Sequence, residues 1–377
     1  MYEKIDRYIR KLIAESSSKA TAWNMERVRE GKPAVWNYID GCMLNALVTM
    51  SEITGDSVYY EFTERFVNDF VNEDGSIRTY QQEKYNLDDI NEGRVLFPVY
   101  KQTGKEKFRL AIESLKKQLD LQPRTKEGNF WHKLIYPDQV WLDGIYMAQP
   151  FRALYATQLG NGDVSDIVRQ IELVREHMFD CEKRLYYHGY DASKTIFWAD
   201  PKTGCSRNFW LRAIGWFSTA LADLIEIIPE SEDRTRLCNV FSELMEGIKQ
   251  YSDSDTGMYY QVVDAVNREG NYLETSGSSM IAYAMLKGAR LGVLDQSYAE
   301  LGKKTFDGIV RTQLTEEGDS IGLNGICLVA GLGPANNTRR DGTFEYYISE
   351  PVVKNDAKGV APFVMCYTEV IRLNPPA

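Results

Sequence analysis

The chain has 377 residues, 44% of them hydrophobic and 26% charged, and 54 acidic against 44 basic side chains give a formal net charge of −10. This acidic balance, with no cluster of Lys or Arg, argues against nucleic acid as a partner. No apolar run approaches the roughly 20 residues that a membrane-spanning helix needs, so no membrane partner is expected either.

The start of the chain does not look like a targeting segment. Residues 1–23 carry charges throughout and contain no apolar stretch, which is not the pattern of a signal peptide. The six cysteines are far apart and show no CxxC or CxxH spacing, so reduced and mostly buried thiols are expected. Only three histidines are present, too few for a His-rich metal site. We therefore expect a cytoplasmic protein without a metal or other cofactor.

Helical periodicity dominates the sequence from its beginning. Ile5, Ile9, Leu12 and Ile13 recur at the spacing of one helix face. The same apolar spacing predicts helices near residues 3–16, 37–53, 57–72, 89–102, 105–121, 143–158, 163–179, 209–228, 232–251, 276–290, 295–312 and 357–372.

A weak internal repeat joins these helices in pairs. Short connections with glycine, at 54–56, 103–105 and 159–162, each link two predicted helices, and glycine is the residue expected just after a helix end. A turn and a short extended stretch follow the second helix, for example at 72–77, 255–260 and 316–321. The unit is thus a helical hairpin of about 50–60 residues, with tight turns at one end and long loops at the other.

Six such hairpins would use up the whole chain, and a repeat of this length is typical of an array or a closed toroid. Because neither terminus shows a polar capping repeat, a closed ring is favoured over an open solenoid. The apolar segments 214–228 and 280–291 are expected in the inner ring, where a helix is covered on all sides. With no Gly/Ser/Pro linker, residues 1–377 are predicted to form a single all-α domain.

Tryptophan is concentrated in the long loops and at helix starts. Stacking platforms for a sugar ring and hydrophobic plugs between loops are equally good interpretations of this pattern. The residues concerned are Trp131, Trp141, Trp198, Trp210 and Trp216.

Two carboxylates stand at the starts of predicted helices, Asp88 and Asp143. Asp is a favoured N-cap, so helix capping is the simpler explanation for both. The alternative is that two helix starts meet at the mouth of the toroid, where two carboxylates would share one proton and form an acid–base pair. Spacing alone does not select these two over other loop acids, namely Asp264, Glu274, Glu350 and Asp356.

Other motifs predict structure rather than chemistry. The Ser-rich segment 275–279 lacks a Gly-x-Ser-x-Gly elbow and is expected to begin a helix. The Gly-x-Gly fragment within 331–334 follows no βα unit, which argues against dinucleotide binding. Arg207, Arg339 and Arg340 are expected to be solvated or ion-paired.

Six longer motifs occur in order between about residue 86 and residue 360, and together they are specific. They are NLDDI (86–90), WLDGIYM (141–147), YHGYD (187–191), FWLRAIGW (209–216), ETSGSSM (274–280) and NDAKG (355–359). In these motifs the chain resembles the unsaturated rhamnogalacturonyl hydrolases of glycoside hydrolase family 105. Family 88, the unsaturated glucuronyl hydrolases, is the related group.

The resemblance implies an (α/α)6 barrel and a hydrolase of pectin degradation. It implies that Asp143 is the general acid/base and Asp88 its partner carboxylate. It also implies a sugar site formed by Lys133, Trp141, Met147, His188, Trp210, Arg212 and Trp216. Tyr38 lies near a position where the family places an aromatic and is added as a substrate-binding candidate.

The implied substrate is a small unsaturated oligosaccharide, about a disaccharide in size, whose terminal uronate carries a C4=C5 double bond. Protonation at C4 would generate a cation at C5, and water would add there before the hemiketal opens and releases the second sugar. One acid can donate the first proton and then accept one from water, and an ionised Asp88 would keep Asp143 protonated by like-charge repulsion. Local positive charge for the anionic substrate is expected from Arg212, Lys133 or His188.

Other functions remain open on the sequence alone. These are an unsaturated glucuronyl hydrolase acting on glycosaminoglycan-type or other lyase products, a conventional inverting glycosidase, a sugar epimerase and a toroid that binds sugar or protein without turnover. The second sugar, the accepted chain length and the choice between monomer and homodimer are not determined by these patterns.

Overall fold

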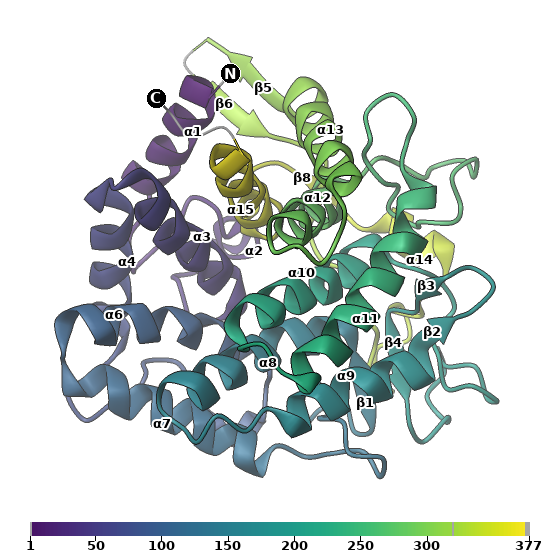
Figure 1. Cartoon of the computed structure of the whole chain (residues 1–377), viewed down its shortest axis with the longest axis horizontal. Coiled ribbons are helices and arrows are strands. Elements are labelled where there is room, and N and C mark those ends of the chain that lie inside the picture. Colours follow the sequence, from purple (N-terminus) through teal and green to yellow (C-terminus); the bar gives the residue numbers. More distant parts are fainter. Residues whose placement is uncertain (1, 319, 374–377) are drawn as a thin grey trace.

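The computed structural model describes residues 2–318 and 320–373 as a ring of inner helices surrounded by outer helices (Figure 1). The inner ring consists of α3 (Tyr38–Thr54), α6 (Leu96–Thr103), α8 (Leu142–Gln158), α10 (Leu211–Ile227), α12 (Thr275–Arg290) and α15 (Ala357–Leu373). The outer helices are α1 (Tyr2–Ala14), α4 (Ser57–Phe70), α7 (Glu106–Leu121), α9 (Ser165–Met178), α11 (Glu232–Ile248) and α13 (Gln296–Thr312).

The ring closes through the two ends of the chain. Neighbouring inner segments pack against one another, with the turns just before α6 (residues 88–95) contacting both α3 and α8, and the last helix, α15, packs against the first, α3. The N-terminal helix α1 lies beside α15, where the rings of Tyr2 and Tyr367 are 5.6 Å apart and the Tyr367 hydroxyl donates to Asp6 (3.2 Å). The predicted closed toroid is therefore confirmed, and the fold is an (α/α)6 barrel.

Burial separates the two layers as the sequence predicts. Every residue of α10 from Leu211 to Ile225 is buried, and so is α12 from Thr275 to Gly288. The outer helix α9 buries only one face. A helix that is apolar on all sides needs cover on all sides, which only the inner position supplies.

The two ends of the barrel differ. At one end, tight turns follow α3 and α6, where Gly55 (φ 70°) and Gly104 (φ 65°) adopt the left-handed conformation that glycine favours. The other end carries long loops with two further helices, α2 (Met25–Glu30) and α14 (Phe344–Ser349). Short antiparallel strand pairs also lie in the loops: β1 (Gln139–Trp141) with β4 (Gly189–Asp191), β2 (Phe179–Asp180) with β3 (Leu185–Tyr186), β5 (Leu314–Glu317) with β6 (Ser320–Leu323), and β7 (Ile326–Cys327) with β8 (Val352–Val353).

The second inner segment is broken, whereas the sequence predicts one helix over 89–102. A short helix α5 (Asp88–Asn91) and a 3-10 turn η2 (Glu92–Val95) precede α6. Pro98 lacks an N–H group and cannot bond to the carbonyl four residues earlier, which weakens α-helical pairing in this turn. The buried Glu92 side chain also accepts the N–H of Asn37 (2.8 Å), which fixes the turn to α3.

The cysteines behave mostly as expected. All six thiols are free, and Cys42, Cys205, Cys327 and Cys366 are buried, but Cys181 is exposed and Cys238 half-buried. Within the two described ranges, no helix is both long and apolar enough to span a membrane.

Candidate active site

The β1–β4 strand pair brings Asp143 next to His188. Trp141 is opposite Gly189 in this pair, and the N–H of Leu142 donates to the carbonyl of His188 (3.2 Å). Asp143 is the second residue of α8, which begins directly after β1, and its Oδ2 lies 3.3 Å from His188 Nε2. Gly189 itself is closely packed, since a Cβ there would lie 2.4 Å from Leu332 Cδ1 and 3.2 Å from the Trp141 ring.

A second set of backbone hydrogen bonds places Asp88. The N–H of Leu87 donates to the carbonyl of His132 (3.2 Å), and the N–H of His132 donates to the carbonyl of Gln139 (2.8 Å). These bonds hold the 132–133 segment beside the start of α5. As a result, Lys133 Nζ lies 2.6 Å from Asp88 Oδ2, and His132 Nε2 lies 3.5 Å from Asp88 Oδ1.

This arrangement fixes the charge of Asp88. Burial alone would raise the pKa of Asp88, but the Lys133 ammonium and the neighbouring His132 hold it below its ordinary value. Burial lowers the pKa of His132 to about 4, although Asp88 opposes this shift. Near neutral pH, Asp88 is therefore ionised and His132 is a neutral imidazole.

Asp143 has different neighbours. Within the described residues, its one ion-pairing neighbour is His188, and its Oδ2 has no hydrogen-bond partner. His188 is fully buried, with Nδ1 2.8 Å from the Tyr347 hydroxyl. Burial raises the pKa of Tyr347, so this hydroxyl stays neutral and can either donate or accept. The imidazole can accordingly turn either an N–H or a lone pair toward Asp143.

Both carboxylates line one cavity of about 190 Å³ at the loop end of the barrel. This volume is below the roughly 300–1,000 Å³ typical of drug-sized ligand sites, so it suits the end of a small molecule. Among the predicted site residues, those in the cavity wall are Tyr38, Asp88, Lys133, Trp141, Asp143, Met147, Trp210, Arg212 and Trp216. The remaining one, His188, packs behind Asp143 and Trp210 instead.

Helix capping does not explain the two carboxylates. The residue before α5 is Leu87 and the residue before α8 is Trp141, and neither Asp88 nor Asp143 makes a capping hydrogen bond. The other loop acids are engaged elsewhere and do not line the cavity. Asp264 pairs with Lys183, Glu350 with Arg339 and Asp356 with Lys358, while Glu274 caps α12 at the Ser-rich segment by accepting the N–H groups of Ser276 and Gly277.

Some of the tryptophans are placed where they could stack on a sugar ring, and another is a hydrophobic plug between loops. Trp141, Trp210 and Trp216 line the cavity, and Trp141 stacks on the ring of His132 with centroids 4.4 Å apart. Trp198 is a plug: it is fully buried in a small cluster behind Trp141, with Tyr136 and Leu332, and donates to the carbonyl of Gly333 (3.0 Å).

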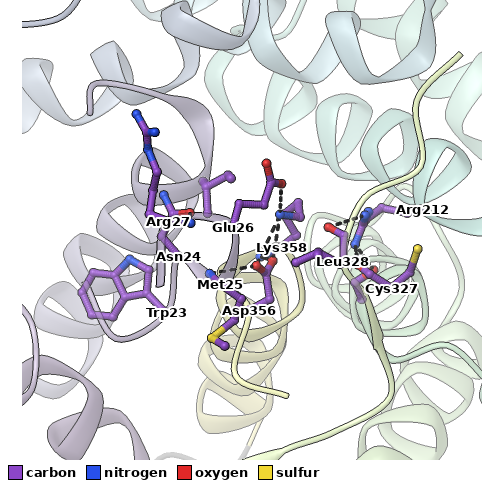
Figure 2. A network of polar contacts seen from close by, with 12 residues as sticks. Trp23, Asn24, Met25, Glu26, Arg27, Arg212, Cys327, Leu328, Asp356 and Lys358 are labelled. Carbon is purple, nitrogen blue, oxygen red and sulfur yellow. Dashed lines mark hydrogen bonds and ion pairs between the residues drawn. The ribbon is translucent and has the colours of Figure 1, made fainter. Parts of the chain in front are cut away.

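Arg212 is the buried cation of the cavity wall. Figure 2 shows its guanidinium held by the backbone carbonyls of Cys327 and Leu328, and it also donates to the Ser276 hydroxyl (3.3 Å). In the part of the chain that the structure describes, no carboxylate forms an ion pair with it. Its charge is therefore fixed in place but not neutralised, which favours binding of an anion.

Two charged wall residues, Arg340 and Glu26, are absent from the predicted site, as are the uncharged wall residues His132, Tyr136, Val329, Ala330 and Gly331. Arg339 pairs with Glu350 (2.6 Å) as expected, and the half-buried Arg340 lines the cavity, a position that the sequence did not predict. Glu26 also lines the cavity, from the unpredicted helix α2. A short polar segment such as 25–30 carries no apolar periodicity that would have revealed it.

The chain matches known carbohydrate-active proteins over nearly its whole length. The family model described as Glycosyl Hydrolase Family 88 matches residues 9–374. A structure of a glycoside hydrolase from family 105 of C. acetobutylicum ATCC 824 is 42% identical, covers 95% of this chain and 98% of that chain, and superposes with a TM-score of 0.87.

Two further similarities cover less of the chain or have a lower sequence identity. Protein Atu3128 of Agrobacterium fabrum is 38% identical over 233 residues, which are 60% of this chain and 99% of that protein. The unsaturated glucuronyl hydrolase of Bacillus sp. GL1, named for degradation of glycosaminoglycan, shares the fold with a TM-score of 0.65 at 15% identity, over 99% of this chain and 94% of that chain.

Proposed function

The chain belongs to glycosyl hydrolase family 88 and its relative, family 105, and from this premise we propose that it releases unsaturated galacturonate from the non-reducing end of lyase-generated rhamnogalacturonan fragments. As a family member it is a glycoside hydrolase. The substrate, the residue roles and a cytoplasmic location, where short imported fragments would be processed, are parts of the proposal.

The difference between Asp88 and Asp143 carries the proposal. Asp88 is held ionised by Lys133, whereas no Lys or Arg of the described residues pairs with Asp143. Two carboxyl groups in one cavity with such different environments are suited to different tasks. Asp143 takes the acid–base role, and Asp88, held ionised by Lys133, is its partner carboxylate.

The chemistry follows from the C4=C5 bond of the substrate. Asp143 protonates C4, and the positive charge that develops at C5 is shared with the ring oxygen. Water attacks C5 and passes its proton to the Asp143 carboxylate, which regenerates the acid. The C5 hemiketal then opens to a ketone, and the second sugar leaves from C1. One carboxyl group serves both proton transfers.

A conventional inverting glycosidase fits this site less well. That reaction needs the second carboxylate as a base that activates water. Asp88 is a poor base, because both of its oxygens face cationic or imidazole groups and its pKa lies below the ordinary value. His188 orients Asp143, and Arg212 is the candidate partner of the uronate carboxylate.

The test is a panel of lyase-generated unsaturated disaccharides, followed by the ultraviolet absorbance of the conjugated uronate. The galacturonyl–rhamnose disaccharide should lose its absorbance fastest. If glucuronyl disaccharides alone are consumed, the rhamnogalacturonan assignment is wrong. Absorbance that persists with every member of the panel would reject unsaturated uronides altogether. Asp264→Asn, which changes an acid outside the cavity, is the matched control and should behave like the wild type.

A further inference from the structure

Glu26 adds a negative charge to the cavity wall that the proposed reaction does not use. It lies in the first turn of α2, and its Oε1 is 2.7 Å from the ammonium of Lys358. Lys358 is buried at the start of α15 and also pairs with Asp356 (3.1 Å). Figure 2 shows the Glu26 and Lys358 side chains pointing toward each other, in the same region as Arg212.

The Glu26 carboxylate is fixed in position and remains accessible. Its side chain is 37% exposed, compared with 1% for Lys358, so the pair presents its negative end to the cavity and solvent. Burial alone would raise the pKa of Glu26, but Lys358, followed by Arg212 and Arg340, holds it below the ordinary value. The group is ionised at neutral pH, and the ion pair restricts its rotation.

The net charge of the cavity wall favours a ligand that carries one anionic group. Lys133 offsets Asp88, and Asp356 offsets the Lys358 ammonium that Glu26 contacts. Asp143 carries no charge in the acid form from which the proposed reaction starts. Arg212 and Arg340 then contribute two positive charges against the one negative charge of Glu26. A substrate with a single carboxylate would neutralise this wall, whereas a second anionic group would be repelled by Glu26.

We infer that Glu26 is a specificity-determining residue that admits a neutral second sugar, whose hydroxyls can donate to it, and rejects one that carries sulfate or carboxylate. The inference rests on the proposed function for the identity of the unsaturated uronate. It deepens that proposal by naming the class of second sugar and the side chain that selects it. Repulsion of the wrong ligand gives specificity here without strengthening binding of the right one.

The experiment compares two unsaturated disaccharides that differ only by a sulfate on the second sugar. Calorimetry measures their binding to protein carrying Asp143→Asn, so that neither ligand is consumed. The unsulfated ligand should bind at least about tenfold more tightly, and adding Glu26→Gln should remove most of this preference. Glu30→Gln is the control, because Glu30 lies in the same helix but is exposed and pairs only with Lys32 among the described residues.

A second variant tests the same charge balance in the opposite direction. Arg340→Gln removes a positive charge from a separate loop and should increase the preference for the unsulfated ligand by about threefold or more. The inference would be overturned if the Asp143→Asn protein that retains Glu26 bound the sulfated ligand as tightly as the unsulfated one, or more tightly. An unchanged preference in a Glu26→Gln protein whose thermal unfolding shows that it is folded would also overturn it.

The two proposals can fail separately. If no disaccharide of the panel is turned over but the preference still depends on Glu26, the hydrolytic function is wrong and the selectivity stands. If turnover occurs and the preference for the unsulfated ligand does not change in Glu26→Gln, the proposed function stands and the proposed role of Glu26 is wrong.

Discussion

Lys133 places its ammonium nitrogen 2.6 Å from Oδ2 of Asp88 and thereby holds one of the two cavity carboxylates in its ionised form. The pair arises because the loop that carries Lys133 bonds through its backbone to the residue before Asp88. Lys133 is therefore engaged with the protein, and Arg212 and Arg340 remain as the cations of the cavity wall available to a substrate anion.

Replacing Lys133 with Met should move the acid limb of activity to higher pH. Without the ammonium, burial is opposed mainly by His132 and the pKa of Asp88 rises, so the ionised form is lost earlier as the pH falls. An opposite charge at this range typically shifts a carboxyl group by about 1–3 pH units, and the limb should rise by a similar amount. The measurement is kcat/KM against pH, with the exposed Lys126→Met as the control. An unchanged acid limb would show that the charge of Asp88 does not matter to the reaction.

Replacing Arg212 with Lys should weaken substrate binding. A lysine ammonium cannot keep the bonds to the carbonyls of Cys327 and Leu328 and also face a carboxylate with two N–H groups. Hydrogen bonds to charged groups contribute about 1.5–3 kcal/mol, so KM should rise about tenfold or more. Arg207→Lys, at an exposed arginine outside the cavity, should leave KM unchanged. A lower kcat at constant KM would instead place Arg212 in transition-state stabilisation.

Replacing Asp223 with Asn should destabilise the barrel. Asp223 accepts from Arg94, Tyr283 and Lys287, each at 2.7 Å, in the interior of the ring. Removing the carboxylate leaves two buried cations without this partner, and the loss of one member of a buried pair costs about 3–5 kcal/mol of unfolding free energy. Urea unfolding at pH 7 measures the difference, and Asp255→Asn, at a surface ion pair with Arg311, is the control.

The same variant should show a specific pH dependence. Burial opposes ionisation of Asp223, but Lys287 and Arg94 lower its pKa to about 2 from an ordinary value of 3.8. Its ionised form therefore contributes its full stabilisation above pH 3.8, and this contribution is lost as the pH falls through about 2. The stability gap between wild type and variant should shrink across this window. A gap that stays constant from pH 7 to pH 2 would contradict the assigned pairing.

Much of the fold could be predicted from local patterns. The apolar periodicity of segments such as 209–228 locates the helices, and glycines such as Gly55 mark their tight connections. The break at η2 and the helix α2 were not predictable in this way. The break follows from Pro98, which the apolar pattern does not register, together with the bond from Asn37 to Glu92, and α2 is held by the ion pair from Glu26 to Lys358, whose members are 332 residues apart.

The site was harder to predict from residue patterns than the fold. Asp88 and Asp143 could not be separated from other loop acids by spacing, and the family resemblance selected them. The structure supplies the missing physical reason, since the other acids cap a helix or pair with a cation outside the cavity. The strand pair that joins Trp141 to Gly189 has no signal in the apolar pattern of either segment.

The most direct test of the account measures two products of one reaction. With the best disaccharide of the panel, release of the second sugar and loss of the C4=C5 absorbance should occur in equal amounts, because hydration precedes departure of the sugar. Asp143→Asn should slow both by about 10²–10⁴-fold, the usual effect of losing a general acid–base group. Release of the sugar while the absorbance persists, or full activity of Asp143→Asn, would contradict the account.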